Sequence, residues 1–145
     1  MPKLRVLVVD DHDVVRHVVC TLLSQDPTLD IVWQSTTGED AVSKAAELRP
    51  DLIVMDIGLP GINGIEAARQ ILQMSSMAKI IFLSQHDSPQ VANEALRVGG
   101  NGYVAKIDAS SELQTAIRAA REGHFFVSQK VRRQGWTGAQ LDGTI

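Results

Sequence analysis

The sequence DLIVMDIGLPG of residues 51–61 determines how the rest of the chain is expected to be arranged. Its apolar run, bounded by proline and glycine, is typical of a β-strand that is buried on both faces. The run ends on Asp56, and the chain then turns through glycine and proline. A carboxylate there suits a turn or a cap. It also suits the carboxyl edge of a parallel sheet, where ligands bind and an ionisable group costs less than in a core.

Three further apolar runs end on polar side chains. LRVLVV at residues 4–9 precedes Asp10 and Asp11, KIIFL at 79–83 precedes Ser84, and GYVA at 102–105 precedes Lys106. Three carboxylates, a hydroxyl and an amine therefore follow four predicted strands. This pattern favours a functional site over an isolated turn.

Five predicted strands, one of them at residues 29–35, alternate with five helical patterns. The starts of four helices are marked by Thr37, Asn63, Asp87-Ser88-Pro89, and Ser110 or Ser111. This alternation predicts an α/β fold with a parallel sheet covered on both faces. Right-handed crossovers then bring all strand carboxyl ends to one edge.

The composition suits a single domain with a real core, since hydrophobic residues make up 44% of 145 residues. The formal charge of −3 argues against nucleic acid binding by this segment, because that function requires a basic surface. The single cysteine excludes an internal disulfide. No apolar run has membrane-spanning length and no signal peptide is seen, so we expect a cytoplasmic protein without membrane contact.

The end of the chain lacks a clear pattern. We expect residues 3–125 to form the domain and residues 126–145 a linker or flexible tail. The basic residues Lys130, Arg132 and Arg133 give residues 129–145 a charge of +2 against Asp142, which leaves −5 for the rest. We interpret them as a solvated linker.

The predicted cluster needs a cation. Each like-charge pair among Asp10, Asp11 and Asp56 costs on the order of 1 kcal/mol in water and about 4 kcal/mol at a partly buried site. Oxygen-only ligands in this number suit Mg²⁺ or Mn²⁺. Lys106 can pair with a carboxylate or with an added anion, and Ser84 supplies a hydroxyl donor.

Four motifs carry a family resemblance: VVDDH at residues 8–12, MDIGLPGING at 55–64, LS at 83–84 and GYVAK at 102–106. Together, over roughly residues 3–125, they resemble the receiver domain of bacterial two-component response regulators. The likeness is strongest to the NarL/FixJ group, whose members carry a LuxR-type helix-turn-helix. It implies a flavodoxin-like, doubly wound, five-stranded parallel sheet with strand order 2-1-3-4-5.

The resemblance also implies the chemistry. Asp56 would accept a phosphoryl group from a phosphohistidine on a sensor histidine kinase, or from a small acyl phosphate. Asp11 would bind Mg²⁺ directly, Asp10 through water, and Gly58 through its backbone carbonyl. Lys106 would pair with the phosphoryl oxygens. Such a domain is not an enzyme in the usual sense, because it catalyses its own phosphorylation and dephosphorylation.

Ser84 and Tyr103 would form the switch of such a domain. Ser84 would move to bond the phosphate, and Tyr103 would then turn inward. Homodimerisation on phosphorylation and transcriptional output through DNA would follow. The residues themselves leave simpler interpretations open, namely that Ser84 is an ordinary loop residue and Tyr103 an ordinary strand aromatic.

The sequence departs from the group in three respects. Gln85 replaces a usual alanine or glycine and is expected to control access to the phosphate. Ile107 stands where proline is frequent. The DNA-binding domain of the group is expected to be absent from this chain, so DNA binding by this segment alone is not expected.

Three other functions compete with this interpretation. A stand-alone receiver would act through protein–protein contacts. An aspartyl-nucleophile phosphatase would carry Asp-x-Asp after its first strand, whereas this chain has Asp10-Asp11-His12. A phosphate-independent interaction domain would not need Asp56 and Lys106. His12 and His86 are expected only to rim the site.

Overall fold

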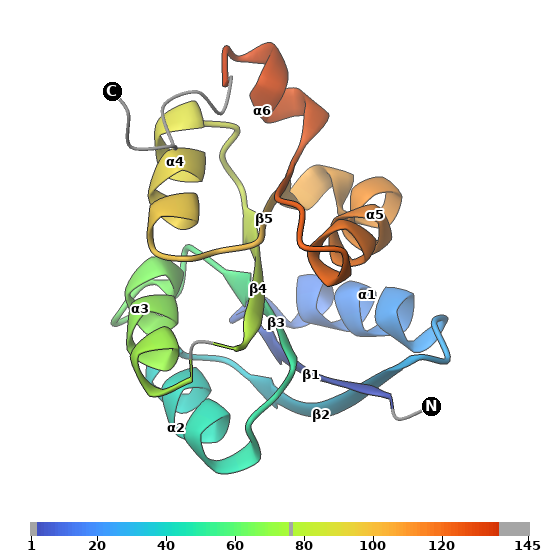
Figure 1. The fold of residues 1–145 in the computed structure, drawn as a ribbon, viewed down its shortest axis with the longest axis vertical. Coiled ribbons are helices and arrows are strands. Elements are labelled where there is room, and N and C mark those ends of the chain that lie inside the picture. The colour runs from blue at the N-terminus through green and yellow to red at the C-terminus, as the bar shows by residue number, and fades with distance from the viewer. Residues whose placement is uncertain (1–2, 76, 137–145) are drawn as a thin grey trace.

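A parallel β-sheet forms the centre of the protein in the computed structural model, which describes residues 3–75 and 77–136 (Figure 1). The strands are β1 Leu4–Val9, β2 Leu29–Ser35, β3 Leu52–Asp56, β4 Lys79–Ser84, β5 Gly102–Ala105 and β6 Phe126–Val127. Their order is β2-β1-β3-β4-β5-β6, with every neighbouring pair parallel. The predicted α/β fold and its 2-1-3-4-5 order are therefore present, but the prediction of only five strands is wrong.

Helices cover both faces of the sheet, as the strand–helix alternation predicts. They are α1 Asp13–Ser24, α2 Gly38–Leu48, α3 Gly64–Met74, α4 Pro89–Arg97, α5 Ala109–Arg121 and α6 Gln129–Arg133, with a short 3₁₀ helix at Lys106–Asp108. Figure 1 shows α2, α3 and α4 on one side of the sheet and α1 and α5 on the other.

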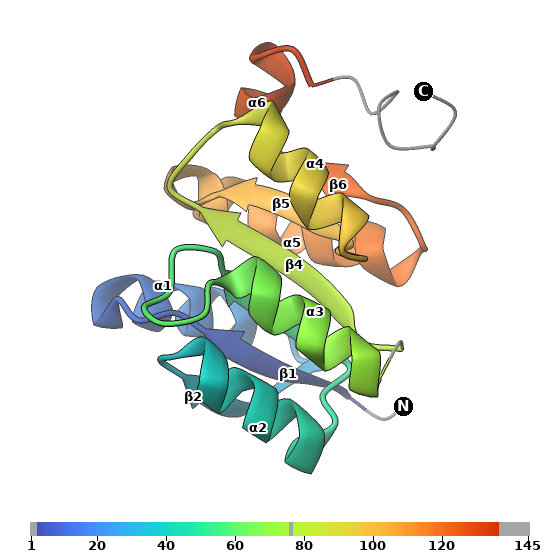
Figure 2. The same ribbon diagram turned by 90° about the vertical axis from the view of Figure 1, so that its left-hand side faces the viewer.

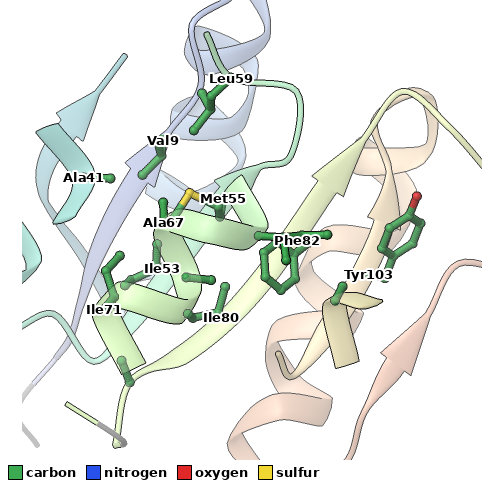
Figure 3. Packing of buried hydrophobic residues seen from close by; sticks show 14 of the residues in the cluster. Val9, Ala41, Ile53, Met55, Leu59, Ala67, Ile71, Ile80, Phe82 and Tyr103 are labelled. Carbon is green, nitrogen blue, oxygen red and sulfur yellow. The ribbon is translucent and has the colours of Figure 1, made fainter. Parts of the chain in front are cut away.

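Alternating strand residues fill the two layers. Leu7 and Val9 of β1 pack on the side of α2 and α3, whereas Val6 and Val8 pack on the side of α1 and α5. Figure 3 shows the first layer, in which Ile53, Met55 and Phe82 meet the buried face of α3. Because both faces of each central strand are buried, the strands are almost purely apolar until they reach the edge where the polar residues lie.

Side-chain caps fix the starts of three helices. Thr37 accepts a hydrogen bond from the Asp40 amide at 3.0 Å, and Asn63 accepts one from the Glu66 amide at 2.9 Å. Ser88 does the same for α4, which has proline in its first turn. Each cap satisfies an amide that the helix itself cannot pair.

The predicted cap of α5 is wrong. The helix begins at Ala109, ahead of both Ser110 and Ser111, and its N-cap residue Asp108 makes no side-chain cap bond. The preceding 3₁₀ turn leads directly into α5 and replaces the expected cap. Ser111 instead donates to the carbonyl of Asp108 at 3.1 Å.

The segment expected to be a linker contains β6 and α6. Both pack onto the domain: Val127 and Val131 are buried with the layer that contains α4. A strand of two residues is too short to show periodicity, which explains why the sequence did not indicate it. The predicted flexible tail falls mainly on residues 137–145, which lie outside the described residues.

Candidate functional site

The predicted polar residues meet at one edge of the sheet. Asp10 follows β1, Asp56 and Ser84 end β3 and β4, and Lys106 follows β5. These strands are parallel and adjacent, so their carboxyl ends lie side by side. Asp10, Asp56 and Ser84 are all buried.

Lys106 holds the cluster together electrostatically. Its Nζ lies 3.1 Å from Asp56 Oδ1 and 3.2 Å from Asp10 Oδ2. Both carboxylates and the lysine are almost fully buried. Buried pairs of this kind are kept only when the partners satisfy one another. With Asp11 nearby, one ammonium faces three carboxylates, and an excess of negative charge remains.

Asp56 is held in a strongly perturbed environment. Burial raises the pKa of its carboxyl to about 6, and the neighbouring Asp10 charge adds to the rise while Lys106 opposes it. The Gly58 amide donates to Asp56 Oδ1 at 3.0 Å. A buried carboxyl with specific charged partners in a cavity is a physical indication of a functional group.

The donor set fits a divalent cation. Asp10 Oδ2, Asp11 Oδ1 and Asp56 Oδ2 are buried without a hydrogen-bond partner among the described residues. Oxygens of Asp10, Asp11 and Asp56 and a ring nitrogen of His12 lie within 4.8 Å of one another. Of these oxygens, Asp10 Oδ2 has only its ion pair with Lys106 and Asp11 Oδ1 only the His12 ring nitrogen at 3.4 Å. Buried carboxylate oxygens without hydrogen bonds are costly, and a hard cation such as Mg²⁺ or Mn²⁺ would satisfy them.

His12 is exposed at the border of the cluster and contacts three of its charged residues. Its Nδ1 is 3.2 Å from Asp10 Oδ1, 3.4 Å from Asp11 Oδ1 and 3.3 Å from Lys106 Nζ. A ring nitrogen cannot donate to a carboxylate and accept from an ammonium at once. Its position follows from the start of α1, because His12 is the N-cap residue and its amide donates to Asp10. Its exposed side chain lies at the rim, where the sequence placed it, but its contacts with the charged groups were not predicted.

An open cavity of about 460 Å³ gives access to the cluster. Its lining includes the predicted site residues Asp11, Asp56, Gly58, Ser84, Gln85 and Lys106, together with His12 and His86. Gln85 is exposed and follows Ser84 directly, so it borders the entrance. A small phosphate-bearing group fits a space of this size and polarity.

Ser84 and Tyr103 share one loop residue. The His86 amide donates to Ser84 Oγ at 3.0 Å, and the Tyr103 hydroxyl donates to the His86 carbonyl at 2.9 Å. Tyr103 is fully buried, and burial raises the pKa of its hydroxyl. Figure 3 shows its ring in the same layer as Phe82. The Tyr103 side chain therefore points inward in this structure.

Comparison with known proteins identifies the family. The family model described as "Response regulator receiver domain" matches residues 6–118. The chain belongs to this family. It is a receiver domain of a two-component response regulator, with a site built from three carboxylates, a serine and a lysine at the strand ends.

Individual response regulators are also similar to this chain. Response regulator GacA of Pseudomonas viridiflava is 35% identical over 131 residues, which is 90% of this chain and 61% of that protein. Transcriptional regulatory protein LiaR of Bacillus subtilis is 34% identical over 128 residues, covering 88% of this chain and 61% of LiaR. The crystal structure of a LuxR-family two-component response regulator from Aurantimonas sp. matches with a TM-score of 0.86 and 34% identity, covering 90% of this receiver and 94% of that chain.

The receiver thus spans about 61% of the length of these curated relatives. Within residues 3–75 and 77–136, no helix combines the length and apolarity needed to cross a membrane.

Proposed function

We propose that this receiver accepts a phosphoryl group on Asp56 and passes the signal on by a change in its own structure. The observation that carries the proposal is the buried Asp56 carboxylate, which lines an open polar cavity and lies 3.1 Å from the Lys106 ammonium. A phosphohistidine of a sensor histidine kinase or a small acyl phosphate would be the donor.

The reaction needs few parts. An oxygen of Asp56 attacks phosphorus, the bond between phosphorus and the donor nitrogen or oxygen breaks, and the leaving group keeps the electron pair. Lys106 stabilises charge on the phosphoryl oxygens from a fixed position, which is electrostatic catalysis by a preorganised group. The chain modifies its own residue, so this activity differs from turnover of an external substrate.

Asp11, Asp56 and the Gly58 carbonyl would hold Mg²⁺ or Mn²⁺, with Asp10 acting through water. The bound ion would neutralise charge on the transferring group. The buried carboxylate oxygens without hydrogen bonds among the described residues support this assignment.

Ser84 and Tyr103 would carry the signal outward. A phosphoryl group brings nearly two negative charges and new acceptor oxygens. The Ser84 hydroxyl accepts from the His86 amide and can donate to such an oxygen, so moving toward the phosphoryl group would pull on its bond to His86. Because Tyr103 bonds to the same residue, the loop after β4 would respond as a unit.

The sequence places the receiver domain at residues 3–125. We propose that it controls transcription through a LuxR-type DNA-binding domain, to which residues 126–145 would connect it. The relatives named as transcriptional regulatory and LuxR-family proteins support this output. Homodimerisation on phosphorylation would accompany it.

Phosphorylation is tested by incubating the protein with acetyl phosphate and Mg²⁺ and measuring intact mass. The wild type is expected to gain one phosphoryl group, Asp56→Asn none, and the control Asp30→Asn, an exposed carboxylate in β2, one. Full labelling of Asp56→Asn would show that the acceptor is elsewhere.

A further inference from the structure

A fully buried serine connects the end of the sheet to two helices. The Ser128 amide donates to the Tyr103 carbonyl at 2.9 Å, and Ser128 Oγ accepts from the Ala105 amide at 2.8 Å. The same hydroxyl donates to Glu112 Oε1 on α5. Glu112 Oε2 also accepts from the Gln129 amide at 3.1 Å, at the start of α6.

These bonds extend the sheet past the end of β6. The backbone pairing between β5 and β6 covers Gly102 with Phe126 and Tyr103 with Val127. Beyond that point the Ser128 side chain takes the place of a backbone acceptor for Ala105. Ala105 pairs with Ser84 on its other side and directly precedes Lys106. The last residue of β5 before the site is therefore held from both neighbouring strands.

The residues that follow Ser128 also contact the layer on the other side of the sheet from α5, which contains α4. The Trp136 indole donates to Asn93 Oδ1 on α4 at 2.8 Å, and its ring packs on Phe125 with centroids 6.1 Å apart. Gln134 Nε2 lies 3.3 Å from Asp87 Oδ2, in the loop that follows Ser84. Both ribbon views place α6 beside α4 (Figures 1 and 2).

Residues 125–136, which we call the C-terminal segment, thus contact the two stretches next to the site, the end of β5 before Lys106 and the loop after Ser84. One set of bonds fixes the strand before Lys106, and the other reaches the loop after Ser84. A perturbation at either place changes the contacts that hold the segment.

We propose that Ser128 is a positioning residue for Lys106, and that the C-terminal segment is thereby energetically coupled to the phosphorylation site. The proposal rests on the proposed function of Asp56. Coupling is reciprocal: if occupation of the site changes how the segment is held, loosening the segment changes the affinity of the site.

Affinity is tested with beryllofluoride, which mimics a phosphoryl group, titrated at fixed Mg²⁺. Ser128→Ala is expected to bind it about fivefold more weakly than the wild type, at the low end of coupling between sites. Ser128→Thr keeps the hydroxyl and is expected to restore binding. Ser110→Ala, an exposed serine on α5, is the matched control and should bind as the wild type does.

Two spectroscopic signals separate positioning from general loosening of the fold. In amide spectra of the wild type, saturating beryllofluoride should shift the Ala105 amide and the Trp136 indole resonances. In a Trp33→Phe background Trp136 is the single tryptophan, so its fluorescence should follow the same titration. These measurements need no substitution at Ser128 and remain valid if Ser128→Ala fails to fold.

The outcomes distinguish the two proposals. Equal affinity of beryllofluoride for the wild type and for a folded Ser128→Ala variant would overturn the coupling alone. So would a titration of the wild type in which neither the Trp136 nor the Ala105 signal changes. No binding to the wild type would overturn the proposed function and the coupling with it. Binding that is abolished by Asp56→Asn and weakened by Ser128→Ala supports both.

Discussion

Asp56 is the residue for which folding and the proposed chemistry conflict most directly. Its pKa is raised to about 6 by burial first and by Asp10 second. A carboxyl with a folded pKa above its unfolded value near 4 stabilises the fold at acidic pH, and this contribution is lost as pH rises through the folded pKa. At neutral pH without metal, the ionised Asp56 therefore destabilises the protein.

Asp56→Asn is accordingly expected to raise the free energy of unfolding at neutral pH without metal, by on the order of 2 kcal/mol. Below about pH 4 the gain should vanish, since the wild-type carboxyl is then neutral. Added Mg²⁺ should stabilise the wild type more than the variant. Denaturant titrations with a chelator check this, with Asp30→Asn as the control. A variant less stable than the wild type at neutral pH would contradict the assignment.

Gln85 is the second residue whose substitution is expected to have a measurable effect. It is exposed beside the cavity entrance, where its side chain can obstruct the in-line approach of water to phospho-Asp56. Gln85→Ala is expected to shorten the lifetime of the phosphorylated form about tenfold, or roughly 1.4 kcal/mol of barrier. Phosphate release is followed over time at equal Mg²⁺, with exposed Gln73→Ala as the control. An unchanged or longer lifetime would show that Gln85 does not limit access.

At the scale of elements, the start of α3 controls the backbone of the site. A Cβ at Gly64 would lie 2.1 Å from the Asp56 carbonyl oxygen, a distance that real side chains do not reach. The Gly64 amide also donates to the Ile57 carbonyl at 2.9 Å. Only glycine allows the helix to begin this close to the end of β3.

Gly64→Ala is therefore expected to destabilise the fold by about 3 kcal/mol, although alanine normally favours helices. The control is Gly58→Ala, because a Cβ there meets only Asp56 Oδ1 at 3.9 Å. Urea unfolding of both variants checks the difference. Equal stability of the two would mean that α3 shifts away from β3 at little cost.

The sequence predicted elements well where local chemistry determines them. The strand at residues 29–35 and the helix starts at Thr37, Asn63 and Ser88 appear as expected, since capping and periodicity act over a few residues. β6 and the start of α5 were missed. β6 depends on pairing across the fold, such as that of Tyr103 with Val127. α5 begins at Ala109 because the 3₁₀ turn at Lys106–Asp108 leads directly into it.

At the scale of the whole molecule, the parallel topology explains why the cluster was predictable. Once strands are assigned, residues at their carboxyl ends must share one edge, whatever their separation in the chain. The roles of His12 and Ser128 were not predictable in the same way. Each depends on where one side chain points after α1 or β6 is in place, which no spacing in the sequence encodes.

The distribution of charge over the molecule gives the last prediction. Residues 129–145 carry +2, with Lys130, Arg132 and Arg133 exposed on α6, but the rest of the chain carries −5. Affinity for DNA comes largely from basic groups that contact phosphates, and specific binders reach roughly 10⁻⁸ M or tighter. A gel shift with the upstream region of its own gene should therefore be blank at micromolar protein, whether or not Asp56 is phosphorylated. A sequence-selective shift that weakens with salt and is lost on Arg132→Ala with Arg133→Ala would instead identify α6 as a DNA contact.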